Sequence, residues 1–228
     1  MPIAGDAPTK LSGTTNATAN VGSSFLISAN SSRVVFLADR DVDGVLELHS
    51  NSLDGTTGLI KLTGALLGTT GVTSFRVTPD GVRVVCRASN DTAGLSEIHS
   101  APATAVGASI KLSSTIISGG NTTGQLERAP NGQRVVSLAN NDSTTLPEPY
   151  SAPVDTVSTS LSASTSASTY RAFGFDSTPD SRRVLCRDTR NSPNKSELFS
   201  AAIGAGSSNA PVAIKEHLRR LTETRLGW

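Results

Sequence analysis

The sequence predicts an all-β fold, a β-propeller built of four four-stranded antiparallel blades of about 50 residues each. Two phrases repeat in phase along the chain and carry this prediction. The first phrase recurs at spacings of 50, 51 and 49 residues, as Arg33-Val-Val-Phe36, Arg83-Val-Val-Cys86, Arg134-Val-Val-Ser137 and Arg183-Val-Leu-Cys186. The second keeps the same step, as Glu47-Leu-His-Ser50, Glu97-Ile-His-Ser100, Glu148-Pro-Tyr-Ser151 and Glu197-Leu-Phe-Ser200. Short β-type runs at this period are typical of propeller blades, which bury their faces by stacking on their neighbours.

The second repeat defines the elements of a blade most clearly. We expect its strands at 73–77, 82–87, 95–100 and 109–112. A turn, Thr78-Pro-Asp-Gly81, joins the first two strands, because proline fixes one turn dihedral and glycine permits another. Apolar residues occupy both faces of the second strand, which indicates a sheet packed between two others.

The repeats set the expected domain boundaries. One propeller domain is expected over 1–215, with repeats at 21–64, 71–114, 122–163 and 170–215. Residues 9–13 read Thr-Lys-Leu-Ser-Gly and match Ile60-Lys-Leu-Thr-Gly64, so they are expected to be a lone fourth strand that completes the blade at the other end of the chain. Ala213-Ile-Lys215 resembles the start of the last repeat's own fourth strand.

The tail, residues 216–228, matches nothing earlier in the chain. A short amphipathic helix and an appended sequence are both open interpretations of it.

Charge and composition exclude some partners. The formal net charge is +1, and the arginines recur singly instead of clustering, so neither nucleic acid nor a membrane surface is an expected partner. No apolar run approaches the roughly 20 residues that span a bilayer. The first residues lack the basic and apolar regions of a secretion signal. The two cysteines, Cys86 and Cys186, hold one repeat position and are expected to be buried free thiols.

An acidic loop in the first repeat is the best candidate metal site. Its carboxylates belong to Asp39, Asp41, Asp43 and Glu47, with Gly44 permitting a sharp turn. Alternate carboxylates on a tight loop can converge oxygens on Ca²⁺. The sequence thus predicts a structural calcium site, with an ordinary solvated hairpin as the alternative.

Two histidines hold equivalent third-strand positions. His49 and His99 stand where the other repeats have Tyr150 and Phe199, a substitution pattern that favours packing. The alternative is that His49 and His99 ligate zinc and activate water for hydrolysis.

The first strand of each blade lines the central channel in many propellers. This directs attention to Arg76, Glu127, Arg128 and Asp176 as channel-lining residues that could bind a small polar ligand. The arginine and glutamate that head the two repeated phrases occur in all four repeats, which favours structural cross-strand pairing. The chain contains none of the common hydrolase or phosphate-binding motifs.

The Thr-Pro-Asp-Gly turn, the Val-Arg-Val-Val strand and the Ser-Glu-Ile-His-Ser segment together resemble the TolB-type propeller repeat. The chain is also similar to bacterial repeat proteins with an Asp-rich loop, matched here by Ala38-Asp-Arg-Asp-Val-Asp-Gly44. The resemblance implies a binding or scaffolding role, often outside the cytoplasm. Such propellers usually have about six to eight blades. Four repeats therefore imply a fragment, an unusually small ring, or a homo-oligomer whose favoured form is a dimer with eight blades.

Uniform repetition favours a non-enzymatic module that binds a protein or a small polar ligand, with a structural Ca²⁺ in the first repeat. The alternative is a metal-dependent hydrolase that cleaves an ester or phosphoester at the channel, which would require zinc.

Overall fold

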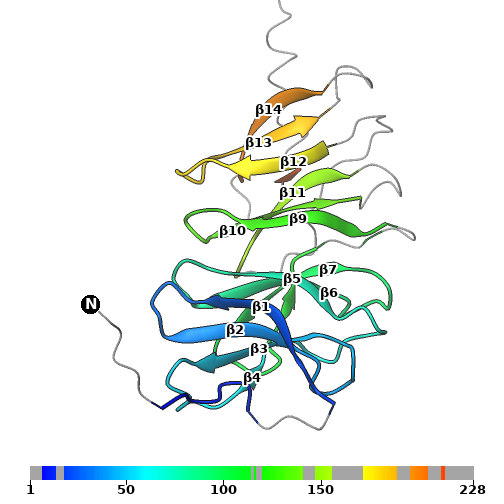
Figure 1. Ribbon diagram of the computed structural model, residues 1–228. Coiled ribbons are helices and arrows are strands. Elements are labelled where there is room, and N and C mark those ends of the chain that lie inside the picture. The colour runs from blue at the N-terminus through cyan, green and yellow to red at the C-terminus, as the bar shows by residue number, and fades with distance from the viewer. Residues whose placement is uncertain are drawn as a thin grey trace, which may run out of the picture.

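The computed structural model describes residues 7–13, 18–113, 116, 120–140, 147–155, 172–188, 196–204 and 212–213. The regular elements in these ranges are β-strands, grouped in four antiparallel sheets. Figure 1 shows the sheets following one another along the chain, with the first and last at opposite ends of the molecule. Each sheet is one blade, so the prediction of an all-β propeller array is confirmed.

Blades one and two contain four strands each, in simple order. Blade one consists of β1 (Val21–Ile27), β2 (Arg33–Ala38), β3 (Glu47–Ser52) and β4 (Ile60–Lys61). Blade two consists of β5 (Val72–Val77), β6 (Arg83–Ala88), β7 (Glu97–Pro102) and β8 (Ile110–Lys111). The strand ends in blade two lie within two residues of those expected from the repeat.

Blade three takes its outermost strand from the far end of the chain. It consists of β9 (Thr122–Arg128), β10 (Arg134–Ala139), β11 (Glu148–Pro153) and β15 (Val212–Ala213). Ala213 pairs with Tyr150 of β11, so its expected place in the fourth strand of the last repeat is wrong. Residues 156–171 contain no copy of the Ile-Lys-Leu phrase that forms β4 and β8, which leaves the edge of β11 to a later segment.

Blade four consists of β12 (Ala172–Ser177), β13 (Arg183–Asp188) and β14 (Glu197–Ala202). Within the described ranges it has three strands, with β14 at its outer edge. The predicted tail, 216–228, lies outside the described residues.

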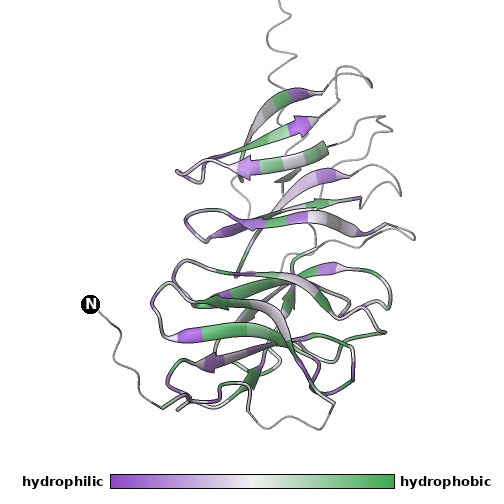
Figure 2. Ribbon diagram, viewed as in Figure 1, coloured by the Kyte–Doolittle hydropathy of each residue, from purple (hydrophilic) through white to green (hydrophobic). Residues whose placement is uncertain are grey.

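The core lies between the blades, as stacked repeats require. Leu37 and Leu62 of blade one pack with Phe75 and Cys86 of blade two. Equivalent positions form the next two interfaces: Ile98, Leu126 and Tyr150 between blades two and three, and Leu138, Phe175 and Cys186 between blades three and four. Figure 2 shows apolar residues in the strands of all four blades. Both cysteines are buried and lie outside any disulfide, as predicted.

The turn between the first two strands of a blade is closed by its own side chains. In blade two the amide of Arg83 donates to Thr78 Oγ1 at 3.0 Å, and the amide of Val82 donates to Asp80 Oδ1 at 3.0 Å. Gly81 follows with a φ of 72°, a left-handed conformation that glycine adopts without a steric penalty. The Thr-Pro-Asp phrase recurs in blade four with the same hydrogen bonds, so this sequence signal forms the same turn there.

Gly71 lets the chain pass against the backbone of blade one on its way into blade two. Its φ is 64°, and a Cβ there would lie 2.8 Å from the backbone N and O of Leu46. The amide of Val72 donates to the carbonyl of Leu46 at 2.7 Å, so this approach begins β5. We expect Gly71→Ala to lower the free energy of unfolding by roughly 2–4 kcal/mol, from left-handed strain and a backbone clash.

Gly58→Ala is the matched control for this substitution in urea unfolding. Gly58 has a φ of 74°, but a Cβ there meets nothing within 4 Å. Gly58→Ala should therefore lower the free energy of unfolding by about 1 kcal/mol, from the strain of a left-handed alanine alone. Equal losses in the two variants would contradict the close approach at Gly71.

The N-terminal segment lies against the outer face of blade one, the face turned away from blade two. Leu11 packs there with Val34 and Phe36, and the side-chain amide of Asn51 donates to the Leu11 carbonyl at 2.7 Å. In the part of the chain that the structure describes, residues 9–13 pair with no strand of blade four. Among the described residues, the expected completion of the last blade by the same chain is therefore not formed.

Candidate functional site

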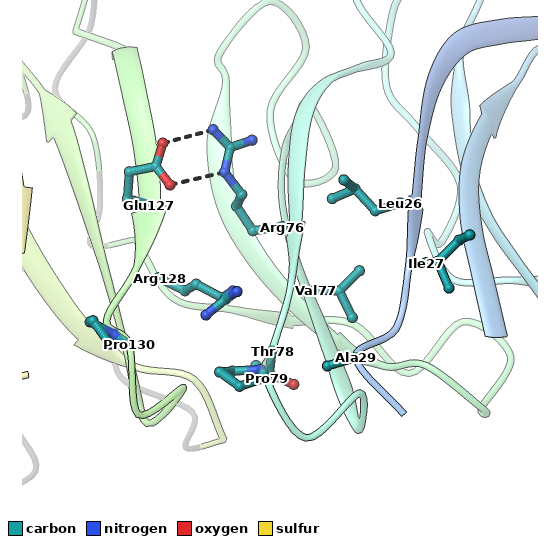
Figure 3. Close-up of a pocket in the computed structure, with 10 residues that line it drawn as sticks. All are labelled: Leu26, Ile27, Ala29, Arg76, Val77, Thr78, Pro79, Glu127, Arg128 and Pro130. Carbon is teal, nitrogen blue, oxygen red and sulfur yellow. Dashed lines mark hydrogen bonds and ion pairs between the residues drawn. The ribbon is translucent and has the colours of Figure 1, made fainter. Parts of the chain in front are cut away.

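The inner strands of blades one to three border an open groove of about 630 Å³. Figure 3 shows its walls, which come from β1, β5 and β9 and from the turns that follow them. The lining residues are Leu26, Ile27, Ala29, Arg76, Val77, Thr78, Pro79, Glu127, Arg128 and Pro130. Mostly apolar walls with a few charged groups are typical of ligand-binding clefts.

Two of the groove's charges neutralise each other across the gap between blades two and three. Arg76 and Glu127 occupy the same repeat position on neighbouring inner strands. Arg76 Nε donates to Glu127 Oε2 at 3.0 Å and Nη2 donates to Oε1 at 2.8 Å (Figure 3). The hydrogen bond from Arg76 to Glu127 raises the pKa of Arg76. This bidentate pair holds the blades together and contributes little net charge to the groove.

Arg128 is the remaining charged group of the groove. It follows Glu127 on β9, at the repeat position where blades one and two have Ile27 and Val77. Its side chain extends into the groove towards β5 (Figure 3). Among the residues that the structure describes, none forms a salt bridge with Arg128 or bonds to its guanidinium. The groove therefore presents one guanidinium without an internal counter-charge.

The structure brings three of the four predicted channel residues together in this groove. Arg76, Glu127 and Arg128 line it, whereas Asp176 does not. Asp176 is exposed on β12, and its carboxylate accepts a hydrogen bond from the amide of Ser177 at 2.8 Å.

The carboxylates of the acidic loop in blade one have two kinds of partner, backbone amides and the ammonium of a lysine. Asp39 is buried and accepts hydrogen bonds from the backbone amides of Asn20 and Gly44. These bonds, first that from Asn20, lower the pKa of Asp39. Asp39 thus ties the loop to the segment that precedes β1.

The ammonium of Lys61 lies between Asp41 and Glu47 and donates to both carboxylates. Asp43, the fourth predicted ligand, is exposed. Lys111 repeats this arrangement in blade two, donating to Glu97 and lying 3.5 Å from Asp91. A lysine on the fourth strand thus supplies the positive charge in each of these loops.

The four predicted calcium ligands do not include a set of three whose oxygens all lie within 4.8 Å of one another, among the described residues. The set that meets this distance is Asp91, Glu97 and His99 in blade two. The calcium site remains a prediction. Elemental mass spectrometry of the dialysed protein would test it, with stoichiometric calcium lost in Asp41→Asn as the supporting result.

The two predicted histidines are buried in the sheets. His49 is 1% and His99 2% exposed. The His49 ring stacks on Phe36 with 5.9 Å between ring centroids. Burial lowers the pKa of His49 to about 4 and also lowers the pKa of His99, so both rings are neutral at pH 7. These surroundings support the packing interpretation over a zinc site that binds substrate.

The repeated arginines bond to serines, partners that the sequence interpretation missed. The Nε of each arginine donates to the hydroxyl of the serine that ends the second phrase. The pairs are Arg33–Ser50 at 2.7 Å, Arg83–Ser100 at 2.9 Å, Arg134–Ser151 at 2.9 Å and Arg183–Ser200 at 2.6 Å. The constant spacing of 17 residues between these partners was the available signal.

No family model and no curated protein matches this sequence. Solved structures do match its fold. Oligopeptidase B from Leishmania major aligns with a TM-score of 0.55 at 10% identity, over 82% of this chain and 25% of that one. A prolyl endopeptidase structure aligns with a TM-score of 0.54 at 11% identity, over 87% of this chain and 29% of that one. A putative TolB from Agrobacterium tumefaciens aligns over 85% of this chain and 86% of that one at 14% identity, but its TM-score is only 0.29.

This chain spans less than a third of the length of both peptidases. At such low identity the likeness concerns the fold alone. Together with the four sheets and their packing, it identifies the chain as a β-propeller module.

Proposed function

We infer that this chain is a non-enzymatic binding module whose inner groove takes a carboxylate-bearing segment of a partner protein. Arg128, the groove's guanidinium without an internal counter-charge, is the observation that carries this proposal. A guanidinium binds a carboxylate through two parallel hydrogen bonds.

The walls beside Arg128 suit the apolar part of such a segment. Leu26 is 38% exposed, and Pro79 and Pro130 add apolar surface at the turns. Because Arg76 is already paired with Glu127, the carboxylate would bind at Arg128.

A fluorescence polarisation assay tests this function. The probe is a pool of labelled hexapeptides with alternating apolar residues, prepared with free or with amidated C-termini. We expect the free-acid pool to bind better. Arg128→Gln should weaken its binding roughly 10- to 100-fold, because a hydrogen bond to a charged group contributes about 1.5–3 kcal/mol.

Arg182→Gln is the control, since Arg182 is exposed on a turn of blade four and does not line the groove. Equal affinity of wild type and Arg128→Gln, or equal binding of acid and amide, would reject the groove as a carboxylate site.

A metal-dependent hydrolase is the second candidate, favoured by Asp91, Glu97 and His99. The ammonium of Lys111 bonds to Glu97 and so competes with a cation there. Zinc-dependent hydrolysis of p-nitrophenyl acetate or phosphate, abolished in a folded His99→Phe variant, would support this candidate.

A further inference from the structure

The two ends of the blade array present the two halves of one interface. The face of blade four that is turned away from blade three is exposed. In the earlier blades the equivalent face is covered by the next blade. Leu198 on this face is 71% exposed, whereas its equivalents Leu48 and Ile98 are 0% exposed. Leu185 is 37% exposed, against 1% for Val85 at the same repeat position. Figure 2 shows apolar residues on β13 and β14 at this end of the stack.

Blade one exposes the complementary half. Phe25 on its outer face is 63% exposed, although the equivalent Phe75 is 4% exposed against blade one. Ile27 is 53% exposed and its equivalent Val77 is 7% exposed. The outer face of blade one therefore carries apolar residues at the positions that contact the preceding blade elsewhere in the array. The outer face of blade four carries them at the positions that contact the following blade.

The N-terminal segment already marks the place of a preceding blade. Leu11 packs on Val34 and Phe36 of blade one. Leu62, from the matching phrase after β4, packs in the same way with Val84 and Cys86 of blade two. Residues 9–13 thus lie where the fourth strand of a blade before blade one would lie, while β14 is the outermost strand of blade four among the described residues.

The repeat also gives the register in which these parts fit. In blade one His49 pairs with Lys61 and Ser50 with Ile60, and blade two repeats this pairing with His99 and Lys111. In blades one and two the lysine of the fourth strand donates to the glutamate that begins the third strand, Glu47 or Glu97. Thr9-Lys10-Leu11 is the matching phrase, and Glu197 is the glutamate of blade four.

We propose that a second copy of this chain completes blade four, with residues 9–13 of one copy pairing antiparallel to β14 of the other. Lys10 then bonds to Glu197 across the interface, and the exposed face of blade one covers Leu185 and Leu198. A twofold axis uses this contact twice and closes a ring of eight blades. Within one chain the inner strands contact one another in order, β1 with β5, β5 with β9 and β9 with β12, and the two end faces lie apart (Figure 1).

Charge reversal tests the predicted pair. By analytical ultracentrifugation the wild-type chain of 228 residues should sediment with twice the 23.5 kDa mass of one chain. Lys10→Glu and Glu197→Lys should each raise the dimer dissociation constant at least tenfold. A mixture of the two single variants should dimerise again, because the new glutamate of one chain then meets the new lysine of the other, and the second contact keeps its native charges. Arg182→Glu, an exposed charge reversal outside both faces, should dimerise like wild type.

Leu198→Asp provides an independent test of the face. Since Leu198 is mostly exposed in the single chain, the variant should fold, give an unchanged circular dichroism spectrum and remain monomeric. A monomeric wild type at 100 μM, a dimer unaffected by both charge reversals, or a failure of the mixed variants to associate would each overturn the proposal.

Discussion

Phe75→Ala should lower the free energy of unfolding by about 3–5 kcal/mol, the usual cost of deleting a buried phenyl ring. Phe75 is 4% exposed and packs between blades one and two with Leu37 and Cys86. Its removal leaves a cavity that the neighbouring sheets cannot fill without shifting, because interiors of this kind are closely packed.

Phe25→Ala is the matched control, at the same repeat position on blade one. Phe25 is 63% exposed in the single chain, so its removal should cost under about 1 kcal/mol when the protein is dilute and monomeric. Urea unfolding of both variants at low protein concentration provides the comparison. Equal losses at that concentration would mean that burial between blades does not distinguish the two rings, contrary to the structure.

The stability of the protein should fall between pH 6.5 and pH 4 because of its buried histidines. The folded-state pKa of His49 is about 4, lowered mainly by burial. An unfolded histidine has a pKa near 6.5, so between these values the unfolded chain binds more protons. The contribution of neutral, buried His49 to the free energy of unfolding is fully present above pH 6.5 and is lost as the pH falls towards 4. The loss is about 3 kcal/mol for His49 alone.

His49→Phe isolates this effect, because repeat four carries Phe199 at the same position. The variant should lose less stability than wild type between pH 6.5 and pH 4, as measured by urea unfolding in a pH series. Below pH 4 the carboxylates with lowered pKa values, such as Asp39 and Asp41, become protonated in both proteins. Parallel profiles of the two proteins above pH 4 would show that His49 is not desolvated.

Local sequence signals predicted most of each blade. Residues such as Pro79 and Gly81 define the turn, and the alternation around Val84 and Cys86 defines a strand buried on both faces, as observed. The repeated histidines at third-strand positions are also buried, in the way that their aromatic counterparts suggested. These features depend on neighbours in the sequence, so the repeat itself reveals them.

The assignment of partners could not be made from the sequence. Lys61 bonds to Asp41 and Glu47, and Arg33 bonds to Ser50, because strand register brings these residues together. A register error of one residue would point each side chain to the opposite face. The constant spacing of 17 residues marks Ser50 as a candidate partner of Arg33, but only the observed register shows that the two side chains lie on the same face and bond.

By itself, the sequence determined the number of repeats, the all-β class and the turn that joins the first two strands of a blade, since these follow from local chemistry repeated at a fixed period. Only the tertiary structure decided that Val212–Ala213 joins blade three, and that Arg76 neutralises Glu127 and leaves Arg128 as the groove's unpaired charge. Those outcomes depend on which sheet edges and side chains meet in space. Such contacts join residues dozens of positions apart, and no local pattern specifies them.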